Sequence, residues 1–242
     1  MNAHELIEQL KKYPVFDLAT FENIADIKHG SAKVRLFRLR KNGYIQQLHR
    51  DSYTVHHDPM IVASRMTWPS YMSLWFALNR HGLTNQLSYE IQVLTTRKVF
   101  RSEIELDNMR ITFLRIKPKY FFGYDRIRFG DQEIFMATPE KAILDGLLFE
   151  KISASEIFDI LRENILKLDV KRLVEFILRC ENSKLAKRMG HMLGNLGHDV
   201  YRDLRKMITP SILLLDWGLP RRGVLDKRWM VLDNVKRPQE VS

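Results

Sequence analysis

Apolar residues in the first 30 positions recur with the spacing of short helices. Within residues 4–13 they fall on one helical stripe, which predicts a first helix. A second helix is predicted over residues 20–27, with Thr20 as its N-cap. Gly30 follows a short polar segment and is expected to adopt the positive φ that ends the second helix. Two short helices and a turn thus open the chain.

The next stretch predicts a longer helix over residues 31–41. Ser31 is its expected N-cap. Ala32, Leu36 and Leu39 recur at the spacing of one core-facing stripe. The basic residues of the same stretch point away from that stripe. The predicted helix is therefore apolar on one side and basic on its open side.

A short hairpin is predicted after this helix. Residues 44–48 and 53–56 each have the pattern of a strand, and residues 49–52 form the polar turn between them. Arg50 lies at the tip of that turn. Two helices joined by a tight turn, with the second one basic and a hairpin behind it, are the parts of a winged helix-turn-helix. We expect this domain within residues 1–60.

The charge pattern of the same segment favours a polyanionic partner. The net charge of the protein is +10, and no Asp or Glu occurs from Ile27 to Arg50. A phosphate backbone requires such a one-sided basic surface, so double-stranded DNA is the expected partner. The residues expected to contact it are Ser31, Lys33, Arg35 and Arg38 in the major groove and Arg50 on the wing. The alternatives are a solvated helix face and a helix-turn-helix that binds another protein.

Residues 61–150 mix helical and strand patterns. A helix is predicted over residues 70–83 with Ser70 as its cap, and another begins at Pro139. Alternating runs between these helices predict an antiparallel sheet. The expected strands are residues 90–96, 109–116 and 119–129. This segment is expected to form a mixed α/β domain.

Residues 151–242 are mainly helical in pattern. A capping box, Ser153 with Glu156, opens the first helix. Further helices are predicted over residues 170–180, 183–196 and 201–207, and residues 212–235 are predicted to form a strand, a turn and a strand. The predicted fold class is therefore α+β: a winged helix-turn-helix, a mixed sheet-and-helix domain and a helical C-terminal portion.

The C-terminal segment is also the most basic. Residues 151–242 hold 18 Lys and Arg against 12 Asp and Glu, whereas residues 1–60 hold 9 against 7. Four cations cluster around the turn of the predicted terminal strands, and they form a second candidate nucleic-acid surface, with a solvated turn as the alternative. These cations are Arg221, Arg222, Lys227 and Arg228.

Motifs of catalysis and cofactor binding are absent from the sequence. It contains no phosphate-binding glycine loop after a strand, no nucleophile elbow and no HExxH zinc motif. His56, His57 and Asp58 are adjacent on an extended segment and point in different directions, which disfavours a shared metal. We expect no cofactor, no metal and no enzymatic activity. A nucleic-acid-processing enzyme with a nuclease-like middle domain is the alternative.

Several residues resemble functional groups but have simpler interpretations. Asp131, Glu133 and Lys141 lack the spacing of a nuclease carboxylate–lysine group. Three glycines lie in a helical pattern that favours close packing over nucleotide binding. They are Gly190, Gly194 and Gly197. The single cysteine, Cys180, has apolar neighbours and is expected in the core. No leader sequence and no membrane-spanning run is evident, so a cytoplasmic location without membrane contact is expected.

Four sequence blocks extend the interpretation over nearly the whole chain. In order they are YMSLWFALNRHGL, KYFFGY, ATPEKAILD and LPRRGVLDKRW. Behind a winged helix-turn-helix, this order resembles the AbiEi family of antitoxins from type IV toxin–antitoxin systems. The resemblance implies a bacterial or archaeal repressor that binds inverted repeats in its own promoter. It also implies an antitoxin that counters a nucleotidyltransferase-type toxin.

The same resemblance limits the expected partners. Antitoxins of this type act without a stable toxin complex, so it implies a functional link to the toxin more than direct contact. A winged-helix repressor with no toxin partner is the further alternative. The sequence leaves open the operator, the oligomeric state and the mechanism of neutralisation.

Overall fold

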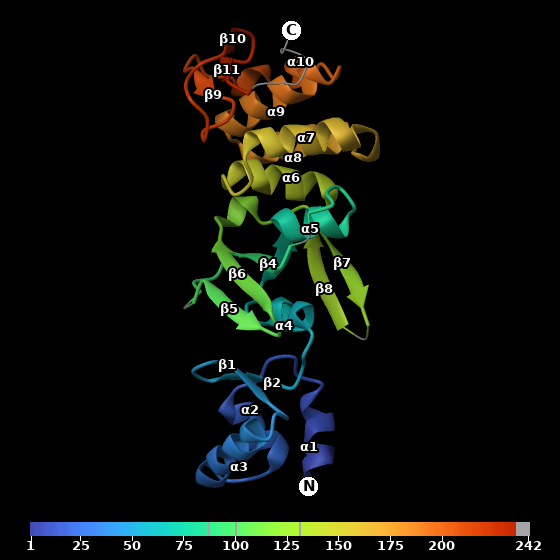
Figure 1. Ribbon diagram of the computed structural model, residues 1–242, viewed down its shortest axis with the longest axis vertical. Coiled ribbons are helices and arrows are strands. Elements are labelled where there is room, and N and C mark those ends of the chain that lie inside the picture. The colour runs from blue at the N-terminus through green and yellow to red at the C-terminus, as the bar shows by residue number, and fades with distance from the viewer. Residues whose placement is uncertain (87, 100, 131, 236–242) are drawn as a thin grey trace. The chain divides into compact units, whose positions relative to one another are not determined.

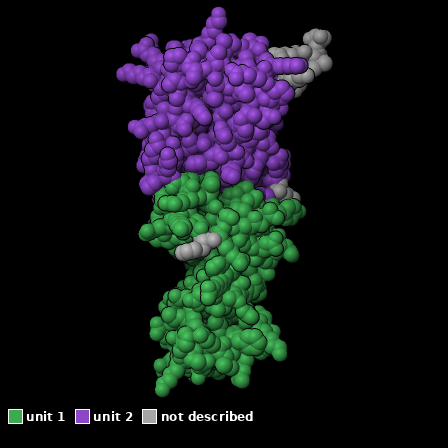
Figure 2. All heavy atoms as spheres, turned by 90° about the vertical axis from the view of Figure 1, so that its left-hand side faces the viewer, with its two compact units in different colours: residues 1–72, 89–116, 126–135 green, residues 73–88, 117–125, 136–242 purple. Residues whose placement is uncertain are grey.

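The computed structural model describes residues 1–86, 88–99, 101–130 and 132–235 (Figure 1). Helices and strands are both abundant, which confirms the α+β class. Within the described residues the chain forms two compact units (Figure 2). Unit 1 comprises residues 1–72, 89–116 and 126–135. Unit 2 comprises residues 73–88, 117–125 and 136–242. These units combine segments that are distant in sequence, unlike the three consecutive segments expected.

Unit 1 begins with helices and a hairpin in the predicted order. The helices are α1 (Ala3–Leu10), α2 (Leu18–Ala25) and α3 (His29–Lys41), and the antiparallel hairpin strands are β1 (Gln46–His49) and β2 (Ser52–Thr54). One apolar cluster holds these elements together beneath α3. Its buried members are Leu6, Leu10, Phe16, Phe21, Ala25, Ala32, Leu36, Leu39 and Ile45. The predicted core stripe of α3 is therefore confirmed.

The ends of α2 and α3 differ from the prediction. Asp17, three residues before Thr20, is the N-cap of α2, and its carboxylate accepts a hydrogen bond from the Thr20 backbone N–H at 2.8 Å. Asp26, with φ 52°, ends α2 in the left-handed conformation assigned to Gly30. Gly30 and Ser31 instead lie inside α3, whose N-cap is Lys28. The predictions of Thr20 and Ser31 as caps and of Gly30 as the helix end are wrong, because Asp17 and Asp26 provide these functions earlier.

Helix α4 (Pro59–Arg65) leads to a mixed sheet with the strand order β5–β6–β4–β3–β8–β7. The strands are β3 (Ser70–Ser73), β4 (Glu90–Thr95), β5 (Glu103–Leu106), β6 (Met109–Arg115), β7 (Tyr124–Phe129) and β8 (Gln132–Ala137). β4 and β6 pair in parallel, so the expectation of an antiparallel sheet is only partly right. The predicted helix over 70–83 is also wrong at its start, because residues 70–73 are fully buried in a strand of the sheet.

Unit 2 contains two helices from the predicted middle segment and the four helices predicted for the C-terminal portion. They are α5 (Leu74–Arg80), α6 (Pro139–Leu148), α7 (Ala154–Asn164), α8 (Val170–Cys180), α9 (Ser183–Asn195) and α10 (Tyr201–Leu204), with 3-10 turns at Pro118–Tyr120, Ile165–Lys167 and Arg205–Met207. Pro139 occupies the first turn of α6, and Ser153 and Glu156 form the predicted capping box of α7. None of the described helices is long and apolar enough to cross a bilayer.

The C-terminal sheet is more complex than the predicted strand, turn and strand. Its strands are β9 (Leu213–Leu214), β10 (Val224–Asp226) and β11 (Val231–Asp233). β11 pairs in parallel with β9 and antiparallel with β10. Asn234 holds the long β9–β10 connection in place. Its side-chain amide donates hydrogen bonds to the carbonyl oxygens of Asp216, Leu219 and Pro220.

Candidate nucleic-acid interface

Helix α3 begins with Lys28 and His29, where the other long helices have a capping side chain. Lys28 has the extended backbone of an N-cap, but its side chain makes no capping hydrogen bond. His29 follows, with Nδ1 2.5 Å from the Glu22 carboxylate. A helix start carries a partial positive charge and exposed N–H groups, so a cation there is unfavourable for the helix by itself. The Glu22 carboxylate lies beside His29, and the side chain of Lys28 leaves the first N–H groups of α3 without a cap.

The hairpin is fixed against the segment that precedes α2. The backbones of Phe16 and Tyr53 exchange hydrogen bonds of 3.0 and 2.8 Å, which extends the hairpin by one bridge. At the turn, the Asp51 carboxylate accepts a hydrogen bond from the Leu18 N–H at 3.2 Å. Arg50 beside it is exposed. These contacts fix the backbone that follows Arg50 against the segment before α2, while the Arg50 side chain extends from the turn into solvent.

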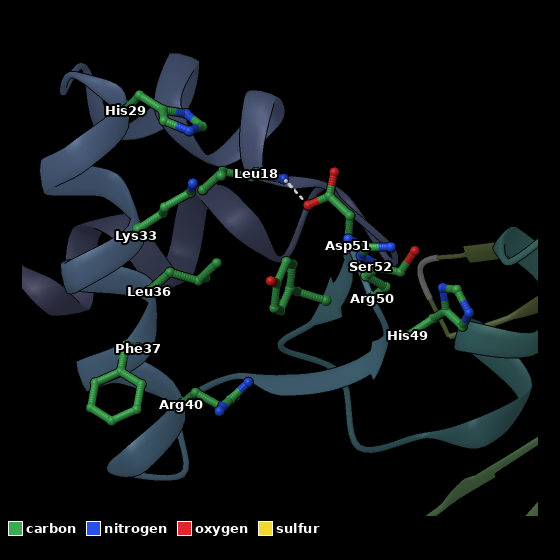
Figure 3. A pocket seen from close by; sticks show the side chains of 11 residues that line it. Leu18, His29, Lys33, Leu36, Phe37, Arg40, His49, Arg50, Asp51 and Ser52 are labelled. Carbon is green, nitrogen blue, oxygen red and sulfur yellow. Dashed lines mark hydrogen bonds between the residues drawn. The ribbon is translucent and has the colours of Figure 1, made fainter.

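A groove of about 840 Å³ separates α3 from the hairpin (Figure 3). Lys33 and Arg40 extend into it from α3, and the hairpin turn forms its other wall. Burial, and then the charge of Asp51, raises the pKa of Tyr53, so this phenol stays neutral. The groove lining consists of Leu18, His29, Lys33, Leu36, Phe37, Arg40, His49, Arg50, Asp51, Ser52 and Tyr53. Asp51 is the one acidic residue of this lining, and it is already bonded to Leu18.

The sequence-predicted contact residues lie on different sides of α3. Ser31 and Arg38 are exposed on the side opposite the core. Lys33 lines the groove, and Arg50 lies across from it on the hairpin. Arg35 points elsewhere, since its Nη2 donates to the carbonyl oxygen of Met1 at 2.8 Å. The structure thus brings Lys33 and Arg50 to one groove and separates Arg35 from them.

Sequence reasoning missed five residues of the same surface. His29 and Arg40 line the groove, one turn before and two turns after Lys33. Val34 and Lys41 are exposed on the side opposite the core, and Phe37 is exposed at the border between that side and the groove, whose lining it joins. The sequence contains a signal for His29 and Arg40, because they lie four residues before and seven residues after Lys33 and therefore share its side of the helix. Val34 and Phe37 were missed because only basic and hydroxyl side chains were expected to contact DNA.

The second candidate surface is divided between the two ends of β10. Arg221 and Arg222 are exposed in the connection before this strand, whereas Lys227 and Arg228 follow it. Arg228 is also engaged, because its Nη2 lies 2.8 Å from both carboxylate oxygens of Asp199. The hydrogen bond from Arg228 lowers the pKa of Asp199. The four cations therefore do not form one free patch around one turn.

The nuclease-like residues have separate partners. Glu133 is exposed and forms an ion pair with Arg126 at 3.2 Å. Lys141 is fully buried and pairs with Asp145, one turn further along α6. Asp131 lies outside the described residues. The two described members of the set are thus each explained by an ion pair of their own.

Histidine neighbours His56 and His57 also point to different partners. His56 Nε2 lies 2.9 Å from the Lys11 carbonyl oxygen, whereas His57 Nδ1 lies 3.2 Å from the Asp107 carboxylate. Over the part of the chain that the structure describes, no group of three or more His, Cys, Asp or Glu side chains is arranged to hold a metal ion.

Gly190 is explained by packing inside unit 2. A Cβ on Gly190 would lie 2.1 Å from the ring of Trp229, so only glycine leaves room for this indole. This confirms close packing at Gly190, although Gly194 and Gly197 make no such approach. Cys180 is fully buried as predicted, and burial raises the pKa of its thiol to about 11.

No family model matches the chain, and no curated protein is significantly similar to it.

Proposed function

We propose that residues 1–60 hold a winged helix-turn-helix that binds double-stranded DNA. In this proposal α3 enters the major groove and the β1–β2 hairpin contacts the backbone. The observation that carries it is the groove between α3 and the hairpin, rimmed by His29, Lys33, Arg40 and Arg50. Neutralising phosphates with the cations Lys33, Arg40 and Arg50 would release condensed counterions, which favours binding.

The residues divide into two kinds of contact. Ser31 and Arg38 are exposed on the outward side of α3, where base edges would lie, and an Arg reads guanine through two hydrogen bonds. The groove is suited to phosphates, whose contacts fix the register of the complex. Its cations are Lys33 and Arg40 on α3 and Arg50 at the hairpin tip. Sequence preference is therefore assigned to the outward side and salt dependence to the groove.

The test is a binding titration on the DNA upstream of the gene, against a shuffled duplex, at two salt concentrations. We expect tight binding to the upstream duplex alone. Arg38→Gln should weaken it by roughly 10- to 100-fold, the range of one lost base contact. Arg35→Gln removes the same charge from the same helix, but Arg35 donates to Met1, so this matched control should lose much less affinity. Equal binding to both duplexes, or equal losses in the two variants, would contradict the proposal.

From the resemblance to AbiEi antitoxins we further propose a regulatory role. The protein would repress its own promoter in the cytoplasm and counter a nucleotidyltransferase-type toxin, without being an enzyme itself. The order of the blocks ending in ATPEKAILD and LPRRGVLDKRW supports this role. Co-expression with a neighbouring nucleotidyltransferase-like gene tests it. Rescue of growth is expected, and rescue must persist in Arg38→Gln if neutralisation is separate from repression. Failure to rescue leaves the plain repressor, and metal-dependent cleavage of DNA would favour the enzyme.

A further inference from the structure

Helix α3 carries apolar residues on two opposite sides. Ala32, Leu36 and Leu39 face the core and are at most 6% exposed. Val34 and Phe37 lie on the other side and are 51% and 57% exposed. Residues three apart are neighbours on a helix surface, so these two side chains form one small apolar patch. Burial within this fold does not account for them.

The surroundings of the patch are polar and basic. Ser31, Arg38 and Lys41 are exposed on the same side of α3, one turn away from Val34 or Phe37. The guanidinium of Arg40 lies 5.9 Å from the centre of the Phe37 ring, and Figure 3 shows this ring standing off the helix beside Arg40. A second copy of the chain would bring the same cations against each other, which disfavours self-association through this patch. The patch therefore fits a partner that is anionic and offers small apolar groups.

The major groove of DNA has this combination. Its one apolar group is the C5 methyl of thymine, which apolar side chains contact in direct readout. We propose that Val34 and Phe37 recognise thymine methyl groups, while Ser31 and Arg38 supply the polar contacts. The inference rests on the proposed DNA binding and names the bases that α3 prefers.

Gly30 supports a close approach on this side. A Cβ on Gly30 would find nothing within 4 Å, and its φ is not positive, so the fold itself does not require glycine. Glycine in a helix is less favourable than alanine. Gly30 precedes Val34 by four residues and so lies on the same outward side. The missing side chain lets base edges come within contact distance of the Val34 patch.

The experiment begins with selection of binding sites from a random duplex pool by the full-length protein. In the enriched duplex each thymine is then replaced by deoxyuridine, which removes only the methyl group. We expect wild-type affinity to fall on the order of 4-fold for each contacted methyl. Phe37→Ala and Val34→Ala should bind the thymine and deoxyuridine duplexes with more nearly equal affinity. Leu166→Ala, a change at an apolar residue that is 98% exposed in unit 2, should keep the wild-type difference.

The outcomes separate this inference from the proposed function. Enrichment of a specific duplex, with equal affinity for its deoxyuridine form, overturns methyl recognition and leaves DNA binding intact. If no duplex is enriched, DNA binding itself fails. If Phe37→Ala binds too weakly to measure, Phe37→Leu retains apolar contact and should restore the preference for thymine. A preference that is unchanged in every α3 variant also overturns the inference.

Discussion

Replacing Gly190 by alanine tests the closest approach of a side chain to a glycine among the described residues of unit 2. Gly190 lies inside α9, and three ring atoms of Trp229 would be 2.1, 2.2 and 2.6 Å from the new Cβ. Ordinary van der Waals contact begins at 3.4 Å. Either the indole or the helix must therefore move by more than an ångström. Trp229 is only 3% exposed and packs edge-on against Tyr201, so the ring has little room to retreat.

The magnitude follows from two opposing effects. Overpacking a core position destabilises by about 1–3 kcal/mol. Alanine in place of glycine within a helix stabilises by about 0.5–1 kcal/mol. With Trp229 present the clash dominates, and Gly190→Ala should lower the free energy of unfolding by about 1–3 kcal/mol. In a Trp229→Ala background the obstacle is gone, and the same change should raise it by about 0.5–1 kcal/mol.

The assay is urea unfolding of all four proteins, followed by far-ultraviolet circular dichroism because one tryptophan is removed. The sign change corresponds to a coupling of about 1.5–4 kcal/mol between the two positions. Gly194→Ala is the control, since its Cβ would lie 3.8 Å from the same indole and should cause no loss. If Gly190→Ala destabilises equally with and without Trp229, the packing argument is refuted, and the glycine must have another role.

Other predictions concern α3, a buried histidine and the single thiol. Gly30→Ala should stabilise unit 1 by about 0.5–1 kcal/mol in urea unfolding while weakening DNA binding, and a gain in both would contradict a close approach to DNA. Burial lowers the pKa of His191, but hydrogen bonds and charges of Asp233 and Asp226 outweigh it, so the pKa is raised overall. Protonated His191 is therefore stabilised by the two carboxylates in the folded protein, which adds to the free energy of unfolding. Because the folded pKa exceeds the unfolded one, this contribution is complete below about pH 6.5 and is lost as pH rises through the folded pKa. Melting temperatures should therefore fall as pH rises above about 6.5, and they should fall less steeply in His191→Gln. Parallel curves for the two proteins would refute a stabilising interaction of His191 with Asp226 and Asp233. Cys180, buried and with a pKa of about 11, should react with iodoacetamide only after unfolding, and rapid labelling of the native protein would contradict its burial.

The sequence was sufficient where local signals agree. The α8 bounds, Val170–Cys180, follow from an apolar stripe behind Asp169, which caps the helix. The capping box of α7 and Pro139 in α6 were equally readable, because these signals act within one helical turn. The order of helices and hairpin in residues 1–56 was predicted for the same reason.

Long-range pairing explains the failures. Residues 70–73 lie in a strand because the sheet surrounds them, and all of them are buried, so no alternation marks the strand. β8 lies beside β3, far away in sequence. At the candidate interface, the positions of Lys33 and Arg50 could be predicted in outline. The hydrogen bond from Arg35 to Met1 could not, because it depends on where α1 begins relative to α3.

Helix α3 differs from the other long helices in three features that are unfavourable for stability. The described helices α1, α2, α6, α7, α8 and α9 all start at a side chain that caps a backbone N–H. α3 starts with Lys28, has Gly30 in its first turn and exposes Phe37 on its outward side. Each departure is unfavourable for an isolated helix, for reasons of charge, backbone entropy and solvation respectively. In the proposed complex a phosphate would offset the first, a closely approaching base edge would use the second, and a methyl group in the major groove would cover the third. One ligand would thus account for all three departures, which is why we propose double-stranded DNA over a solvated basic helix.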